Sequence, residues 1–124
     1  MPARSVLFVG GTGKISSACV VRALGAGWDV YVLNRATTVG RPLPDGVTSF
    51  TADVRDAESV RAALGGHEFD AVANFVVMTE EQAGADIDLF AGRTAQYVFI
   101  SSASAYQKPV ARIPIVESTP LRNP

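Results

Sequence analysis

A glycine-rich turn near the amino terminus carries the residue types best suited to chemistry. Gly10–Ser16 (GGTGKIS) follows the apolar run Val6–Val9 and leads into a helix-compatible run that ends near Ala26. A strand, a glycine turn and a helix in this order form the arrangement that binds the pyrophosphate of a dinucleotide. Glycines leave no Cβ between backbone amides and phosphate, and the helix presents unpaired N–H groups to the anion. A tight strand-to-helix turn without a ligand has the same local pattern and remains the alternative.

The spacing inside the turn separates two phosphate-binding motifs. A P-loop needs glycine at position 8 and serine or threonine at position 15, where this chain has Phe8 and Ile15. Gly10 and Gly13 instead keep the spacing of a dinucleotide site, and Ser16 stands where a third glycine is expected. The Ser16 side chain adds bulk at a close helix–strand contact, and its hydroxyl could reach a phosphate.

The residues after the second predicted strand bear on the choice of cofactor. Trp28–Leu33 is rich in β-branched and aromatic residues and predicts a strand, and Asn34 and Arg35 follow it. An NAD site usually has an acid here that binds the ribose 2′-OH. Because this chain has no carboxylate there and Arg35 could pair with a 2′-phosphate, the sequence favours NADP over NAD. The alternative is that Arg35 is a solvated loop residue.

Polar residues also follow the third predicted strand, Val47–Ala52. Ligands gather at the carboxyl ends of strands in open α/β sheets, so Asp53 and Val54 are candidates for adenine binding. Asp53 could accept a hydrogen bond from the adenine amino group or cap the next helix. Asp56 is the better cap, because the predicted helix Ala57–Leu64 begins just after it.

The second half of the chain predicts a further strand–helix–strand unit. Asp70–Val77 is mostly apolar and predicts the fourth strand, with Asn74 and Phe75 near the point where a nicotinamide ribose is expected. Thr79 is positioned to cap a helix over 80–91, and 97–101 predicts the fifth strand. Strands and helices that alternate in this way predict a Rossmann-type, doubly wound parallel sheet in the order 3-2-1-4-5.

Two predicted helices should each bury one apolar face. In the helix over 14–26, the apolar residues at helical spacing are expected to form this face: Ile15, Ala18, Cys19, Val21 and Leu24. The same spacing gives the face of the helix over 80–91 as Ala83, Ile87 and Phe90.

Composition excludes several classes of protein. The 124 residues suit one domain, 48% hydrophobic residues can form a core, and a net charge of −1 gives no electrostatic case for nucleic-acid binding. The single cysteine, Cys19, is expected to be a buried thiol in a reducing, cytoplasmic compartment. No apolar run is long enough for a membrane helix, and no metal-ligand cluster stands out. His67, the only histidine, is expected to be exposed and without a chemical role.

Taken together, these segments resemble the short-chain dehydrogenase/reductase superfamily, and within it the extended or atypical branch, the NAD-dependent epimerase/dehydratase family. The resemblance runs from Ser5 to about Thr119 and rests on four segments: Gly10–Ser16, Leu33–Arg35, Asp53–Asp56 and Tyr97–Tyr106. It implies a cofactor site made of Gly10, Thr12, Gly13, Lys14, Ile15, Asn34, Arg35, Asp53, Val54, Asn74 and Phe75.

The resemblance also implies oxidoreductase chemistry, for which this chain lacks parts. The family uses a serine after the fifth strand and a Tyr-x-x-x-Lys pair on the next helix, where the tyrosine moves a proton while hydride moves at the nicotinamide. Ser102 resembles the serine, but none of the three tyrosines has a lysine four residues later. Loss of a general acid/base typically costs about 10²–10⁴-fold in rate.

We therefore expect an NAD(P)-binding Rossmann domain over residues 1–106 and an extended, proline-containing tail over 107–124, with the chain ending before the catalytic helix and substrate domain. The expected function is the cofactor-binding portion of an epimerase/dehydratase-like oxidoreductase, inactive alone. A non-catalytic NADP(H)-binding sensor or regulatory module is the alternative. Expected partners are the dinucleotide and a small-molecule substrate of unknown identity, with no nucleic acid and no membrane. An uncovered apolar patch near Ile87 and Phe90 favours a homo-oligomer.

Overall fold

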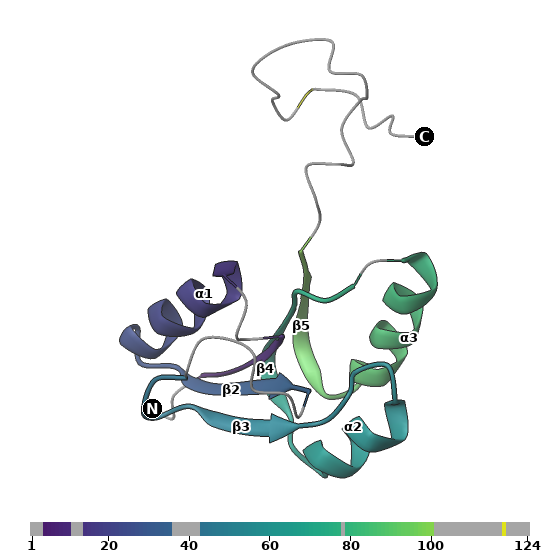
Figure 1. Cartoon of the computed structure of the whole chain (residues 1–124), viewed down its shortest axis with the longest axis horizontal. Coiled ribbons are helices and arrows are strands. Elements are labelled where there is room, and N and C mark those ends of the chain that lie inside the picture. Colours follow the sequence, from purple (N-terminus) through teal and green to yellow (C-terminus); the bar gives the residue numbers. More distant parts are fainter. Residues whose placement is uncertain (1–3, 11–13, 36–42, 78, 101–117, 119–124) are drawn as a thin grey trace.

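The computed structural model describes residues 4–10, 14–35, 43–77, 79–100 and 118. Within these residues the strands form one parallel sheet in the order β3-β2-β1-β4-β5, which confirms the predicted doubly wound arrangement (Figure 1). The elements in chain order are β1 (Ser5–Val9), α1 (Lys14–Gly25), β2 (Asp29–Asn34), β3 (Thr48–Thr51), α2 (Ala57–Leu64), β4 (Phe69–Asn74), α3 (Glu80–Phe90) and β5 (Thr94–Phe99).

The sheet is the middle of three layers. Helix α1 covers one face, and α2 and α3 cover the other (Figure 1). Central strand β1 is buried on both faces: Val6 and Phe8 pack on the α1 side, and Leu7 and Val9 pack on the opposite side. A strand covered on both faces has no solvent side, which is why β1 is apolar without alternation.

The structure corrects the predicted buried face of α1. Ile15 and Val21 are 67% and 59% exposed, whereas Ser16 and Val20 are buried. Cys19 and Leu24 are only partly buried against the sheet. The prediction failed because it selected apolar residues at helical spacing and passed over a serine, while the helix turns its small Ser16 toward β1 to approach the sheet closely.

The predicted face of α3 is also partly wrong. Phe90 is buried as expected, but Ile87 is 54% exposed, and Asp86 and Leu89 take the inner positions. The predicted apolar patch near Ile87 therefore lacks Phe90. Three residues at the end of the β5 segment expose apolar side chains instead: Val98, Phe99 and Ile100.

Both predicted helix caps are confirmed. The Asp56 carboxylate accepts a hydrogen bond from the Ser59 amide at 3.3 Å, so Asp53 is not the cap of α2. The Thr79 hydroxyl accepts one from the Gln82 amide at 3.1 Å. Such bonds satisfy amides that have no partner in the first helical turn.

Candidate functional site

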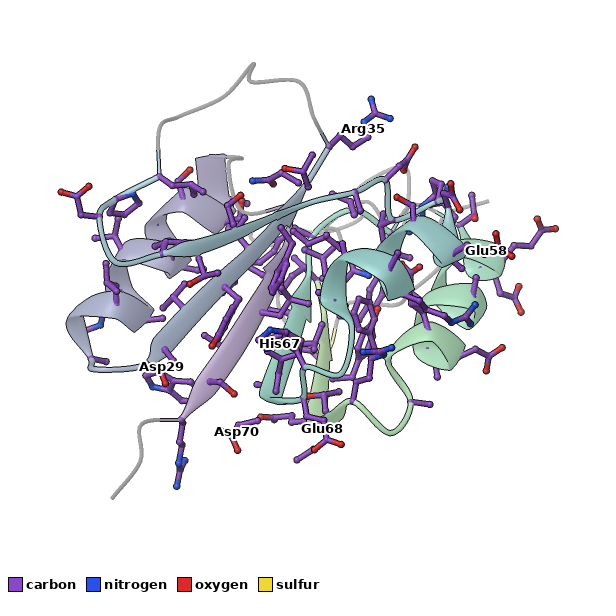
Figure 2. The ribbon with its side chains drawn as sticks, turned by 90° about the horizontal axis from the view of Figure 1, so that it is seen from below. Asp29, Arg35, Glu58, His67, Glu68 and Asp70 are labelled. Atoms are coloured by element: carbon purple, nitrogen blue, oxygen red, sulfur yellow. The ribbon has the colours of Figure 1, made fainter. Side chains whose placement is uncertain are left out.

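A cavity of about 380 Å³ lies beyond the carboxyl ends of β1, β2 and β3. This edge includes the switch point, where the chain passes from β1 outward to β2 and then back to β4, and open α/β sheets bind ligands there. Figure 2 shows Arg35 beyond the end of β2, at the opposite end of the molecule from Asp29 and Asp70. Ten residues line the cavity: Val9, Gly10, Leu33, Asn34, Arg35, Asp53, Val54, Arg55, Val76 and Gln82.

Gly10 fixes the floor of this cavity. Its φ of +84° is a left-handed conformation, and a Cβ at this position would lie 2.6 Å from Val76 Cγ1. The Gly10 amide donates to the Leu33 carbonyl at 2.9 Å, so this N–H is committed to the sheet. Only glycine combines this conformation with so close an approach of the β4–α3 connection.

Ser16 holds the turn from the helix side. Its hydroxyl donates a hydrogen bond of 2.6 Å to the Gly10 carbonyl, and the residue is 2% exposed. The serine at the third-glycine position therefore donates its hydroxyl hydrogen bond to the backbone carbonyl of Gly10. The sequence had suggested a phosphate oxygen as the partner of this hydroxyl. The short side chain still lets α1 approach β1.

The end of β3 adds a carboxylate to the cavity. Asp53 is partly buried, and its Oδ1 accepts a hydrogen bond from the Arg55 amide at 2.9 Å. This bond turns the chain sharply after β3 and brings both Val54 and Arg55 to the cavity wall. The wall thus combines an apolar surface with a carboxylate and two arginines, Arg35 and Arg55.

A buried polar network lies behind this wall. Arg55 Nη2 donates to Asp86 Oδ2 at 2.6 Å, and Asn74 Nδ2 donates to the same oxygen at 2.8 Å. Asn74 Nδ2 also donates to the Tyr97 hydroxyl at 2.9 Å, while Asn74 Oδ1 accepts from the Val76 amide at 3.0 Å. Every polar side-chain atom of Asn74 is therefore satisfied, and the network connects the β3–α2 connection with β4, α3 and β5.

The network perturbs Tyr97. Burial is the largest cause and raises the pKa of this phenol above its ordinary value, because burial disfavours the phenolate. The hydrogen bond from Asn74 lowers the pKa in part, and the nearby Asp86 carboxylate raises it further.

The structure brings together five of the predicted cofactor-binding residues: Gly10, Asn34, Arg35, Asp53 and Val54. Three others are not among the residues that line the cavity. Asn74 is buried in the network, Phe75 packs on Phe8 with ring centroids 6.2 Å apart, and Ile15 is exposed.

The remaining predicted positions cannot be compared in the same way. Thr12, Gly13 and Ser102 lie outside the described residues, as does the 107–124 tail apart from Ser118, and the Lys14 side chain is likewise not described. His67 is exposed, as expected, and its ring lies among Tyr31, Phe50 and Phe69 (Figure 2).

Sequence reasoning missed Arg55, Val76 and Gln82 as cavity residues and Asp86 as the buried ion-pair partner of Arg55. Arg55 had a local signal, because it directly follows the Asp53-Val54 pair. Within the described parts of the chain, no group of His, Cys, Asp or Glu could hold a metal ion, and no helix is long and apolar enough to cross a bilayer.

With the fold and cavity established, comparison with known proteins gives the class. The model of the NAD dependent epimerase/dehydratase family matches residues 6–124, and the chain belongs to this family. Among curated proteins it is 30% identical over 135 residues to a UDP-glucose 4-epimerase of Streptomyces lividans, across 94% of this chain and 41% of that protein. The chain thus spans about two fifths of the length of this relative.

Solved structures share the fold. A UDP-glucose 4-epimerase superposes with a TM-score of 0.80 at 21% identity, over 95% of this chain and 41% of the other. The Bordetella bronchiseptica enzyme WbmG in complex with NAD superposes with a TM-score of 0.76 at 16% identity, over 98% of this chain and 44% of that one. At these identities the similarity establishes the Rossmann-type fold.

Proposed function

We propose that this chain binds NADP(H) in preference to NAD(H) in the 380 Å³ cavity, with the adenosine half against the ends of β2 and β3. The observation that carries the proposal is the lining at the end of β2: Asn34 and Arg35 face the cavity where an NAD site usually has a carboxylate. A guanidinium can pair with a 2′-phosphate through two parallel hydrogen bonds, whereas a carboxylate would repel it.

Different residues of the cavity contact different parts of the dinucleotide. The amino terminus of α1 receives the pyrophosphate. Gly10 shapes the cavity floor beside it, because the missing side chain leaves room for Val76. Asp53 accepts a hydrogen bond from the adenine amino group, and Val54 and Val76 pack against the ring. The bound dinucleotide supplies hydride chemistry at its nicotinamide ring.

The activity we propose for the whole protein is that of an epimerase/dehydratase-like oxidoreductase, with these 124 residues as its cofactor-binding portion. By themselves they should not turn over substrate, because no tyrosine among them has a lysine four residues later. A non-catalytic NADP(H) sensor is the second candidate. It is favoured if the nucleotide binds and no Tyr-x-x-x-Lys helix accompanies these residues in the full reading frame.

We also propose that the chain self-associates through the outer face of α3, where Ile87 exposes an apolar side chain. Sedimentation velocity tests this directly. An Ile87→Gln variant should shift the distribution toward monomer, and an unchanged distribution from a folded variant would contradict the role of this surface.

The test of the proposed cofactor preference is a titration of the folded chain with NADPH and NADH, followed by nicotinamide fluorescence. In an Arg35→Ala variant, NADPH should bind about tenfold or more weakly, because a hydrogen bond to a charged group contributes ~1.5–3 kcal/mol. NADH affinity should change little. Arg61→Ala, which removes an exposed arginine from α2, is the matched control and should affect neither. Equal losses for both nucleotides in Arg35→Ala would contradict the proposal.

A further inference from the structure

Two arginines face the cavity, and they differ in their partners. Arg55 forms an ion pair with Asp86, with Nη2 and Oδ2 2.6 Å apart. No acidic side chain in the described part of the chain forms an ion pair with Arg35. Among the described residues, the cavity therefore has one arginine with an acidic partner, Arg55, and one without such a partner, Arg35, beside the carboxylate of Asp53.

We propose that Asp86 determines how strongly this site prefers a 2′-phosphate, because it neutralises Arg55 from behind the cavity wall. The inference rests on the dinucleotide site proposed above. Asp86 itself does not line the 380 Å³ cavity, so it acts on the nucleotide through its charge, which offsets the charge of Arg55. It is a positioning and specificity residue and makes no contact with the ligand.

The position of Asp86 supports this role. The residue is 1% exposed, on the inner face of α3, where a buried polar group needs hydrogen-bond or ion-pair partners. Arg55 supplies the opposite charge, and Asn74 supplies a second hydrogen bond to the same oxygen at 2.8 Å. The Arg55 side chain is 31% exposed, so its charge reaches both the buried acid and the cavity.

The size of the effect follows from the size of the cavity. A 380 Å³ cavity is about 9 Å across when treated as a sphere. Removal of the Asp86 charge leaves the positive charge of Arg55 unbalanced at the cavity wall. At 0.01 M ionic strength this should strengthen binding of a phosphate of charge about −2 by roughly threefold. The same change should fall below about twofold at 0.15 M, because the Debye length shortens to about 8 Å.

The experiment measures the ratio of the NADH and NADPH dissociation constants for the wild-type chain and three variants. Asp86→Asn keeps the shape of the residue, removes its charge and should raise the ratio about threefold at low salt. Arg55→Gln leaves the Asp86 charge unbalanced and should lower the ratio by about the same factor. The double variant Arg55→Gln/Asp86→Asn restores neutrality and should return the ratio to the wild-type value.

The control is Asp88→Asn, which removes an equal charge from an exposed position of the same helix. It should change the ratio less than Asp86→Asn does, since the Asp88 side chain is exposed to water and is not the ion-pair partner of Arg55. Circular dichroism establishes that each variant is folded. Either single variant is sufficient if the other does not fold, because the two have opposite expected signs.

A purely structural role for the pair predicts a different pattern. Both single variants would then weaken binding of the two nucleotides alike and leave the ratio constant, and this result would overturn the inference. Binding of neither nucleotide by the folded wild-type chain would instead contradict the proposed dinucleotide site itself. The two failures are therefore distinguishable.

Discussion

Substitution of Gly10 by alanine tests the geometry of the cavity floor. The new Cβ would meet Val76 Cγ1 at 2.6 Å, and the residue would keep a φ of +84°. The left-handed conformation costs an L-residue about 1–2 kcal/mol, and overpacking of a tight contact costs about 1–3 kcal/mol. The free energy of unfolding should therefore fall by about 2–5 kcal/mol, a large part of the ~5–15 kcal/mol typical of a domain.

Urea denaturation followed by circular dichroism measures this change. Gly84→Ala is the matched control, because Gly84 lies in α3 and no atom within 4 Å meets its added Cβ. Alanine there should raise the free energy of unfolding by up to about 1 kcal/mol, since glycine is the poorer helix former. The two substitutions make the same chemical change and have opposite expected signs.

The double variant Gly10→Ala/Val76→Ala separates the two costs at Gly10. Loss of the Val76 Cγ atoms removes the steric contact but leaves the backbone conformation, so the two substitutions should couple favourably by about 1–3 kcal/mol. The reasoning is refuted if Gly10→Ala is no less stable than Gly84→Ala, or if the cycle shows no coupling.

Three further outcomes are expected. Burial raises the pKa of Tyr97, so the contribution of its protonated form to stability should be complete below about pH 10. This contribution should be lost as the pH rises through the higher pKa of the folded state. Tyr97→Phe should therefore remove this part of the decline in urea midpoint at alkaline pH. Asp56→Ala should lower the free energy of unfolding by about 1 kcal/mol through loss of the α2 cap, whereas Asp56→Asn should retain most of it, as urea titration would measure. Asn74→Leu should cost at least about 1–3 kcal/mol, since it leaves the Val76 amide without this partner and removes one of the two hydrogen bonds to the buried Asp86 carboxylate.

The order of the strands could be predicted because its signals are local. The apolar run of β1 and the caps at Asp56 and Thr79 each depend on neighbouring residues, and the structure confirms them. Strand–helix alternation then leaves few parallel topologies. The meeting of Gly10, Asn34 and Asp53 at one cavity follows from that topology alone.

The polar network could not be predicted because its partners are distant in sequence. Arg55 and Asp86 are 31 residues apart, and Asn74 and Tyr97 are 23 apart. An acid within a helix is usually on the solvent side, so nothing local marks Asp86 as buried. The same limitation affected α1, where the prediction weighed apolar Ile15 above Ser16, although the close approach of helix and strand requires the smaller residue.

The central claim is that this chain is a working dinucleotide site at the carboxyl edge of the sheet. Isothermal titration calorimetry of the folded wild-type chain with NADPH and NADH tests it most directly. We predict saturable binding of both with tighter binding of NADPH, because the cavity lies at the carboxyl edge of the sheet and Arg35 meets the 2′-phosphate. No heat of binding with either nucleotide, from protein that circular dichroism shows to be folded, would contradict the account.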